Sequence, residues 1–206
     1  MTYGEKLGVM KELRNGPPIE ICIGTDKILL CPVNNNWRSV FDNLPEKCGR
    51  WRKLNPTVAN SSFKITKDRT ISWLDFNISA CETTLLFIIK NEMLGEIGHI
   101  GFDLMEDSSI WISRVVRGEK GVPGAMSEAV REICSIAFSK FDCDEIFLEC
   151  YEDNIRGVNF YQENGFSIIG KKFLLPKQLN DEVTWAECSE KDDYKRVMLV
   201  LLKTKR

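Results

Sequence analysis

Apolar and polar residues alternate with two different periods along this chain, and these periods predict its elements. From Gly124 to Phe141, apolar residues recur every three or four positions, which predicts an amphipathic helix with one buried face. Short runs rich in β-branched and aromatic residues lie on both sides of this helix, separated by Gly, Pro, Asn and Asp. The predicted strands are Ile19–Ile23, Ile28–Val33, Thr84–Lys90, Gly95–Leu104, Ile110–Val116, Glu145–Cys150, Phe166–Phe173 and Lys195–Lys203.

The lengths of the linkers then predict how the strands pair. Asn91–Glu92 and Glu106–Ser109 are short and polar, so the three strands from Thr84 to Val116 are expected to form an antiparallel meander. The strand at Glu145–Cys150 follows the long helix and is expected to pair in parallel with its predecessor through a crossover. The pattern therefore predicts an α/β chain of the mixed α+β type, in which helices flank a central mixed sheet of about six to seven strands.

Three shorter helices are expected at Asn36–Leu44, at Thr70–Ala80 and from Asn154 to Glu163. Thr70 can cap the second of these helices. That helix would bury its apolar positions, which are Ile71, Leu74 and Ile78.

The 206 residues are enough for one domain with a sizeable core. Residues 1–18 end in the turn cluster Asn15-Gly16-Pro17-Pro18 and are expected to form an N-terminal extension. Residues 19–206 would then form the domain. Between the last two strands, the charged segment 175–194 is expected to be a long loop.

Charge and hydropathy exclude several classes of partner. The net charge of −2 gives the chain no bulk attraction to nucleic acid or to anionic membranes. The longest apolar runs, such as Val197–Leu202, are far shorter than the roughly 20 residues of a membrane-spanning helix. The first residues also lack the basic start and apolar stretch of a signal peptide. We therefore expect a cytoplasmic protein with neither nucleic acid nor a membrane as partner.

The eight cysteines do not predict a metal site. No two of them form a Cys-x-x-Cys pair, and His99 is the only histidine, so no metal is expected. Several cysteines fall inside apolar patterns, where cysteine packs as a small hydrophobic residue. A cysteine hydrolase is also disfavoured, because its nucleophile would depend on that single histidine.

The turn after Val116 has the chemistry of a phosphate-binding loop. Gly121 and Gly124 allow positive φ and a close approach of the backbone, and the helix that starts near Gly124 presents unpaired N–H groups. Arg117 and Lys120 add positive charge. The turn lacks the Gly-Lys-Ser/Thr triplet of a nucleoside-triphosphate site, and the antiparallel strands before it disfavour a dinucleotide fold.

A second motif lies downstream and consists of Asn154, Phe160-Tyr161 and Glu163-Asn164-Gly165-Phe166. With the element order and the glycine turn, it resembles the Gcn5-related N-acetyltransferase (GNAT) family. The resemblance extends over about residues 27–203 and is specific over about 95–166. It implies a single GNAT-like domain that transfers an acetyl group from acetyl-CoA, as cosubstrate, to a primary amine of a small molecule.

The resemblance also implies roles for individual residues. The backbone of Val115 and Val116 would pair with the pantetheine amides, and Asn154 would hydrogen-bond the pantetheine arm. Tyr161 would stand near the thioester sulfur and protonate the departing thiolate. The pyrophosphate would rest on the amides from Gly121 to Met126. The other implied cofactor-binding residues are Arg117, Lys120, Val122, Pro123, Gly124, Ala125, Arg156 and Asn159.

The turn departs from the family pattern at two positions. Counted back from Gly124, the position of the expected basic residue holds Glu119, so Arg117 fits only if the loop contains two extra residues. Pro123 stands where a small flexible residue is usual, although proline suits a first helical turn. The loop is therefore expected to follow an irregular path.

The amine must lose a proton, and four side chains could accept it. Glu96 and His99 would lie on opposite faces of one strand, so at most one of them points at the ligand cleft. Asp103 and Glu149 are comparable candidates near the ends of core strands. None of the four stands out as the base, and ordered water is the alternative.

The acceptor stays open at this stage. The form of the turn, with Gly-His-Ile-Gly-Phe before it, resembles family members associated with amino sugars, including nucleotide-linked ones. Aminoglycosides, polyamines, and protein N-termini or lysines are the alternatives. So is an acyl-CoA-binding module that does not turn over. The chain is expected to be a monomer or a homodimer.

The residues that shape the acceptor pocket are expected in segments 36–80 and 175–194. Trp37, Trp51 and Trp185 there could stack on a sugar ring or pack as core and lid aromatics. A basic set in the first segment is expected to be a solvated surface, with contact to an anionic substrate or cofactor as the alternative. That set consists of Arg50, Arg52 and Lys53.

Overall fold

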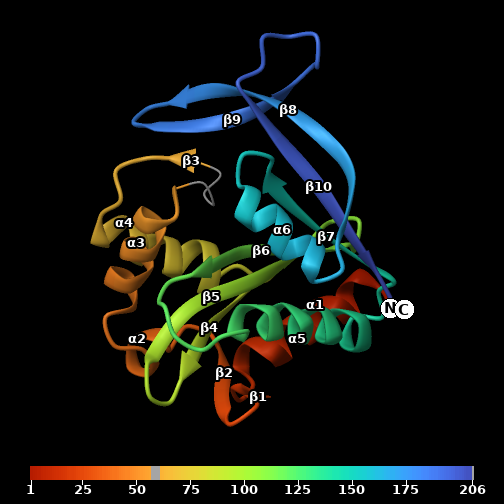
Figure 1. Ribbon diagram of the computed structural model, residues 1–206. Coiled ribbons are helices and arrows are strands. Elements are labelled where there is room, and N and C mark those ends of the chain that lie inside the picture. The colour runs from red at the N-terminus through yellow and green to blue at the C-terminus, as the bar shows by residue number, and fades with distance from the viewer. Residues whose placement is uncertain (57–60, 206) are drawn as a thin grey trace.

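The computed structural model describes residues 1–56 and 61–205. Figure 1 shows one curved sheet with helices on both of its faces. The helices are α1 (Tyr3–Asn15), α2 (Trp37–Val40), α3 (Leu44–Leu54), α4 (Lys67–Ser72), the π-helix η2 (Trp73–Ser79), α5 (Ala125–Lys140) and α6 (Ile155–Glu163). The strands are β1 (Ile19–Ile23), β2 (Asp26–Pro32), β3 (Ser61–Ser62), β4 (Thr84–Asn91), β5 (Gly95–Leu104), β6 (Ile110–Arg117), β7 (Glu145–Tyr151), β8 (Ser167–Leu179), β9 (Glu182–Cys188) and β10 (Arg196–Thr204).

The strands of the described residues form one ten-stranded sheet in the order β1-β2-β4-β5-β6-β7-β10-β8-β9-β3. β6 and β7 pair in parallel, on either side of α5 in the sequence, and the other neighbours are antiparallel. The mixed fold, the meander and the parallel crossover are thus confirmed. The sheet is larger than the six to seven strands predicted, because all eight strands expected from the sequence join it and β3 and β9 extend its far edge.

The segment predicted to be a loop at 175–194 contains a β-hairpin, so that prediction was wrong. β8 continues to Leu179, the chain turns at Asn180 with a φ of 53°, and β9 returns along β8. In Figure 1 this hairpin arches over the side of the molecule that carries α3 and α4. Its β9 half is partly exposed along most of its length, so buried and exposed positions do not alternate along it.

Two helix predictions also need correction. The helix expected at Asn36–Leu44 is the short α2 followed by α3, because Asn43 adopts a left-handed conformation with a φ of 54°. The helix expected from Thr70 starts earlier, where the Thr66 side chain accepts a hydrogen bond from the Arg69 amide. Leu74 and Ile78 are buried as predicted, whereas Ile71 is only partly buried. α5 is confirmed, with Gly124 and Phe141 as its caps.

Residues 1–18 hold a helix that the sequence pattern did not predict. α1 begins with a capping box between Thr2 and Glu5, and Met10 and Leu13 are buried in the main core. Arg14 is buried as well and donates hydrogen bonds to the carbonyl groups of Thr84 and Cys81. α1 therefore packs on the sheet as part of its core face.

The sheet separates two hydrophobic cores. The larger core lies under α1 and α5 and contains Phe87, Phe102 and Phe141. The smaller core lies under α2, α3 and η2 and contains Trp37 and Trp51. All eight cysteines are free thiols, and most of them are buried, in keeping with packing as small hydrophobic residues. In the part of the chain that the structure describes, no helix is long and apolar enough to cross a membrane.

Candidate active site

The centre of the sheet is opened by the divergence of β6 and β7. These strands pair only from Ile110–Ile112 to Ile146–Leu148. Beyond this point β7 continues along β10 and β6 continues along β5. Within the described residues, the β6 edge from Ser113 to Arg117 therefore has no strand partner on the β7 side, and its backbone groups can pair with an extended ligand.

Two bulges shape the strands beside this opening. In β5, Ile89 pairs with Gly98 and Lys90 with Glu96, so Ile97 is an extra residue. In β6, the register shifts near Arg114, whose φ of 55° is unusual for a residue with a side chain. Such bulges bend a strand and redirect its side chains.

The first bulge overturns the prediction that Glu96 and His99 face opposite sides of the sheet. Glu96 forms an ion pair with Lys47 of α3, and the His99 ring lies 6.0 Å from that of Trp51, also on α3. Both side chains therefore face α3, because the extra residue at Ile97 shifts the alternation by one position. Only His99 reaches the cavity described next.

A cavity of about 640 Å³ lies between α3, α4, η2 and the strands β5 and β6. Ser113 and Arg114 are consecutive in the sequence, yet both line this cavity, because the second bulge turns their side chains to the same face of the sheet. Glu182 of the β8–β9 hairpin lies at its other end. The described lining residues are Cys48, Gly49, Arg52, Asn55, Phe63, Ile65, Arg69, Thr70, Ser72, Trp73, Asn77, His99, Asp103, Ser113, Arg114, Val116 and Glu182.

His99 forms part of the cavity wall as a neutral imidazole. Its Nδ1 lies 2.6 Å from the Arg114 carbonyl oxygen, which can only accept, so Nδ1 donates and Nε2 keeps its lone pair. Burial lowers the pKa of His99 to about 4. Its Nε2 can therefore accept a hydrogen bond from an amine, but it holds a proton weakly.

The other candidate bases are engaged in ion pairs. Asp103 lines the cavity and accepts hydrogen bonds from Arg114 Nη1, at 2.8 Å, and from the Thr84 hydroxyl, at 2.6 Å. Glu149 lies on β7, 2.7 Å from Lys172 Nζ, and is not among the residues that line the cavity. Burial is the largest single influence on the pKa of Glu96 and raises it, but hydrogen bonds from Lys47 and from the backbone, together with the charges of Lys47 and Lys90, leave the pKa below its usual value.

The start of the turn after β6 is fixed to the sheet and to α3. The amides of Gly118 and Glu119 both donate to the Ile97 carbonyl at 2.9 Å. The Glu119 carboxylate accepts a hydrogen bond from Trp51 Nε1, at 2.9 Å, and pairs with Arg50. This explains the acidic residue at a position where a basic one was expected, since Glu119 holds the loop against α3.

The second half of the turn presents its amides. No described residue accepts a hydrogen bond from the backbone N–H of Gly121, Val122, Gly124 or Met126. Gly124 has a φ of 81° and caps α5, so these donors lie at the positive end of the helix dipole. Pro123 has no N–H to offer, and the side chains of Val122 and Ala125 are buried in the main core.

The basic residues near the turn are exposed. Arg117 donates from Nε to the Glu119 carbonyl at 3.2 Å, and Lys120 extends into solvent. Arg156 and Asn159 are exposed on α6. The contribution of Val115 and Val116 is their backbone on the open edge of β6, because Val115 packs toward the main core and Val116 toward the other.

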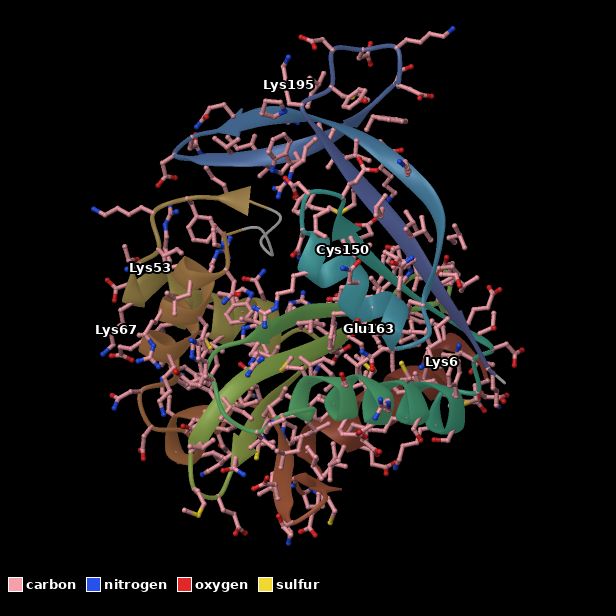
Figure 2. The ribbon with its side chains drawn as sticks, in the orientation of Figure 1. Lys6, Lys53, Lys67, Cys150, Glu163 and Lys195 are labelled. Carbon is pink, nitrogen blue, oxygen red and sulfur yellow. The ribbon has the colours of Figure 1, made fainter. Side chains whose placement is uncertain are left out.

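α6 holds the two residues that the second motif singled out. Asn154 Oδ1 accepts a hydrogen bond from the Gly157 amide at 3.1 Å, so this side chain caps the helix. Figure 2 shows Cys150 and Glu163 near the two ends of α6. Tyr161 is buried, with its ring 5.3 Å from that of Phe160 and 6.1 Å from that of Phe166. Burial raises the pKa of Tyr161 above its usual value, so the phenol stays protonated.

Several cavity residues were not predicted from the sequence. Trp73 of η2, Arg69 of α4 and Phe63 before α4 lie in segment 36–80, where the acceptor pocket was expected, but no motif singled out these three residues. Trp37 and Trp51, expected as possible stacking residues, are buried core residues. Trp185 packs with Tyr151, Leu174 and Met198 in a third cluster. The described residues contain no group of three or more His, Cys, Asp or Glu side chains that could hold a metal ion.

Comparison with known proteins gives consistent results. A family model described as "Acetyltransferase (GNAT) domain" matches residues 36–167. A search of curated proteins found no match. Among solved structures, a "probable acetyltransferase" of the GNAT family from Chromobacterium violaceum is 15% identical, with a TM-score of 0.61, and the alignment covers 92% of this chain and 87% of that one. A GNAT family acetyltransferase from Bacillus anthracis is 14% identical, with a TM-score of 0.59, and the alignment covers 90% of this chain and 98% of that one. The Campylobacter jejuni N-acetyltransferase PseH, in complex with acetyl coenzyme A, is 14% identical, with a TM-score of 0.55, and the alignment covers 87% of this chain and 99% of that one. At these identities, the structural likeness shows a common fold.

Proposed function

The chain belongs to the acetyltransferase (GNAT) domain family, and from this premise we propose that it transfers an acetyl group from acetyl-CoA to the primary amine of a small molecule. One observation carries the proposal. The unpaired edge of β6, from Ser113 to Arg117, lies between the amide-presenting turn at the start of α5 and the cavity under α3. A ligand bound along this edge would connect the proposed phosphate site to the cavity under α3.

The residues present fit the cosubstrate. Pantetheine contains amides, and the free backbone of Val115 and Val116 offers them hydrogen-bond partners. The donors from Gly121 to Met126 suit a pyrophosphate, because they combine free N–H groups with the helix dipole. The exposed side chains of Lys120 and Arg156 are available for further phosphate contacts.

In the proposed reaction, the amine nitrogen attacks the thioester carbonyl carbon, a C–N bond forms and the C–S bond breaks. Tyr161 gives its phenolic proton to the departing sulfur, which its raised pKa permits because the group is protonated across the physiological range. The amine loses a proton at the same time. His99 Nε2 and Asp103 can align this N–H, and solvent takes up the proton, because the pKa of His99, about 4, is too low to retain it. The Tyr161 phenolate then regains a proton from solvent as the thiol leaves.

The shape of the cavity favours a small acceptor over a protein. Its outer end is lined by Phe63 and by Glu182 of β9, and β9 is joined to the α3 and α4 side of the molecule through its pairing with β3. A protein N-terminus or lysine would need an open groove for the flanking chain. An amino sugar, free or linked to a nucleotide, stays among the candidates.

The test measures free thiol released from acetyl-CoA in the presence of a panel of amines. We expect the release of thiol to depend on the amine that is added. The panel contains amino sugars, amino acids and polyamines. Omission of the amine serves as the control for hydrolysis. Binding of acetyl-CoA without release on any amine would refute the enzymatic proposal and support a binding module.

A further inference from the structure

The basic set Arg50, Arg52 and Lys53, expected to be a solvated surface, divides into three different environments. Arg50 pairs with Glu119 of the turn, and Lys53 is exposed on the outer side of α3, where Figure 2 labels it. Arg52 instead lines the cavity and is only partly exposed. Burial lowers the pKa of Arg52, with Glu182 acting in the opposite direction. A side chain from the basic set thus enters the proposed acceptor site.

A second arginine meets the same aromatic ring. The guanidinium carbon of Arg52 lies 4.2 Å from the Phe63 ring centroid, and that of Arg69 lies 5.0 Å from it. Both arginines and Phe63 line the cavity. Both guanidinium groups lie against one ring and line one cavity, so together they supply N–H donors of the kind that bind a carboxylate or a phosphate; we call this pair the arginine fork.

In this structure, carboxylates from the hairpin stand near the fork. Arg69 Nη2 lies 2.5 Å from Asp181, which is in the β8–β9 turn, and Glu182 follows it in the cavity wall. Asp181 is two-thirds exposed, so this pair is worth at most about 1 kcal/mol. An anionic ligand can displace Asp181 at little cost, since a guanidinium offers five donors.

The other end of the cavity suits an amine. His99 Nε2 and the Asp103 carboxylate are acceptors there, and the Arg114 cation is already paired with Asp103. The arginine fork also lies on the α3 face of the sheet, whereas the phosphate-binding turn leads into α5 on the opposite face. The fork is therefore placed to contact the acceptor and not the phosphates of the cosubstrate.

We propose that the acceptor is an amine that carries a carboxylate or a phosphate, and that Arg52 and Arg69 bind this anion while the amine points to Asp103 and His99. The inference rests on the proposed function and names its substrate class. Arg52 and Arg69 are specificity residues in this scheme, and Asp181 pairs with Arg69 when no acceptor is bound.

The experiment compares kcat/KM within matched pairs of amines. The carboxylate arm uses 6-aminohexanoate against 6-aminohexanamide and the common amino acids against their amides. The phosphate arm uses glucosamine 6-phosphate against glucosamine. We expect the anionic member of at least one arm to be favoured by about tenfold or more, since a hydrogen bond to a charged group contributes about 1.5–3 kcal/mol. The favoured arm identifies the anion.

Substitutions locate the effect. Arg52→Gln and Arg69→Gln should each lower kcat/KM for the anionic member by about 10- to 100-fold and change the neutral member by less than about threefold. Asp181→Asn should raise kcat/KM for the anionic member by up to about fivefold. Lys53→Gln, on the outer side of the same helix, is the matched control and should change neither. Arg69→Lys keeps the charge, and it replaces Arg69→Gln if the latter does not fold.

The outcomes separate this inference from the proposed function. Acetylation of neutral and anionic amines with equal kcat/KM, or an equal loss on both in the arginine variants, would overturn the inference and leave the acetyltransferase proposal standing. Absence of thiol release with every amine of both arms would overturn both.

Discussion

Replacement of Tyr161 by phenylalanine removes one oxygen atom and little else. The Tyr161 side chain is 9% exposed and packs between Phe160 and Phe166 in the main core. No described residue is hydrogen-bonded to its hydroxyl group. The ring contacts are retained in the variant, so we expect the free energy of unfolding to change by less than about 0.5 kcal/mol. Truncation to alanine would instead cost about 3–5 kcal/mol, because it leaves a cavity.

The effect on turnover should be far larger than the effect on stability. Proton transfer from a positioned side chain contributes about 10²- to 10⁴-fold to rate, which corresponds to about 3–5 kcal/mol of barrier. We therefore expect kcat of Tyr161→Phe to fall at least about 100-fold, with KM for acetyl-CoA changed by less than about threefold. Because burial raises the pKa of Tyr161, the wild-type rate should not decline through ionisation of this group below about pH 10.

The assay is thiol release at saturating amine, paired with urea unfolding of the same samples. Tyr151→Phe is the matched control. Tyr151 is also buried, lies against the Arg196 guanidinium, and packs in a separate cluster with Leu174 and Met198. We expect this variant to keep its kcat and its stability. A folded Tyr161→Phe variant with kcat within about threefold of wild type would refute proton donation by Tyr161 and leave its ring as a packing element only.

Two further predictions concern stability and the turn. The pKa of His99 is lowered from its ordinary 6.5 to about 4, so its stabilising contribution is present above pH 6.5 and is lost as the pH falls toward 4. Between pH 7 and pH 4, urea unfolding should show wild type losing about 3 kcal/mol more than His99→Gln, whereas equal losses would contradict the burial argument. Gly118→Ala should destabilise the protein by about 1–3 kcal/mol and weaken acetyl-CoA binding in calorimetry, because the added Cβ would lie 2.1 Å from the fully buried Trp51 ring. Gly8→Ala, on the exposed side of α1 with open space around it, is the control and should be neutral or stabilising.

The sequence was sufficient for the elements whose patterns are local. α5 has a long apolar stripe, and short polar linkers join β4, β5 and β6, so periodicity and turn chemistry predict them without knowledge of their partners. The parallel pairing of β6 with β7 follows from the helix between them. The position of the glycine turn after β6 follows in the same way, since it depends on glycine and on the start of α5.

The lining of the cavity under α3 could not be predicted in this way, because contacts distant in sequence create it. Phe63 lies over Arg52 and Arg69, and Arg69 meets Asp181 across more than a hundred residues of sequence. None of these pairs has a periodic signal. The hairpin that brings Asp181 into place is charged and exposed on both faces, so its pattern resembles that of a loop.

The bulge in β5 has a local signal in the sequence, which is the isolated Gly98 inside a strand pattern. A Cβ on Gly98 would lie 2.4 Å from the Val116 carbonyl oxygen, so this position admits only glycine while β6 follows its path. An isolated glycine inside a strand pattern indicates a bulge or a close approach of another backbone. The extra residue at Ile97 places one carbonyl group where it accepts hydrogen bonds from both Gly118 and Glu119, which bends the turn toward α3. The same bulge brings the side chains of Glu96 and His99 to one face of the sheet. The rule that successive side chains of a strand point to opposite faces therefore fails where β5 helps to form the cavity. The path of β6 at Val116 and Arg117, and with it the position of its open edge, thus depends on a close approach that Gly98 makes possible.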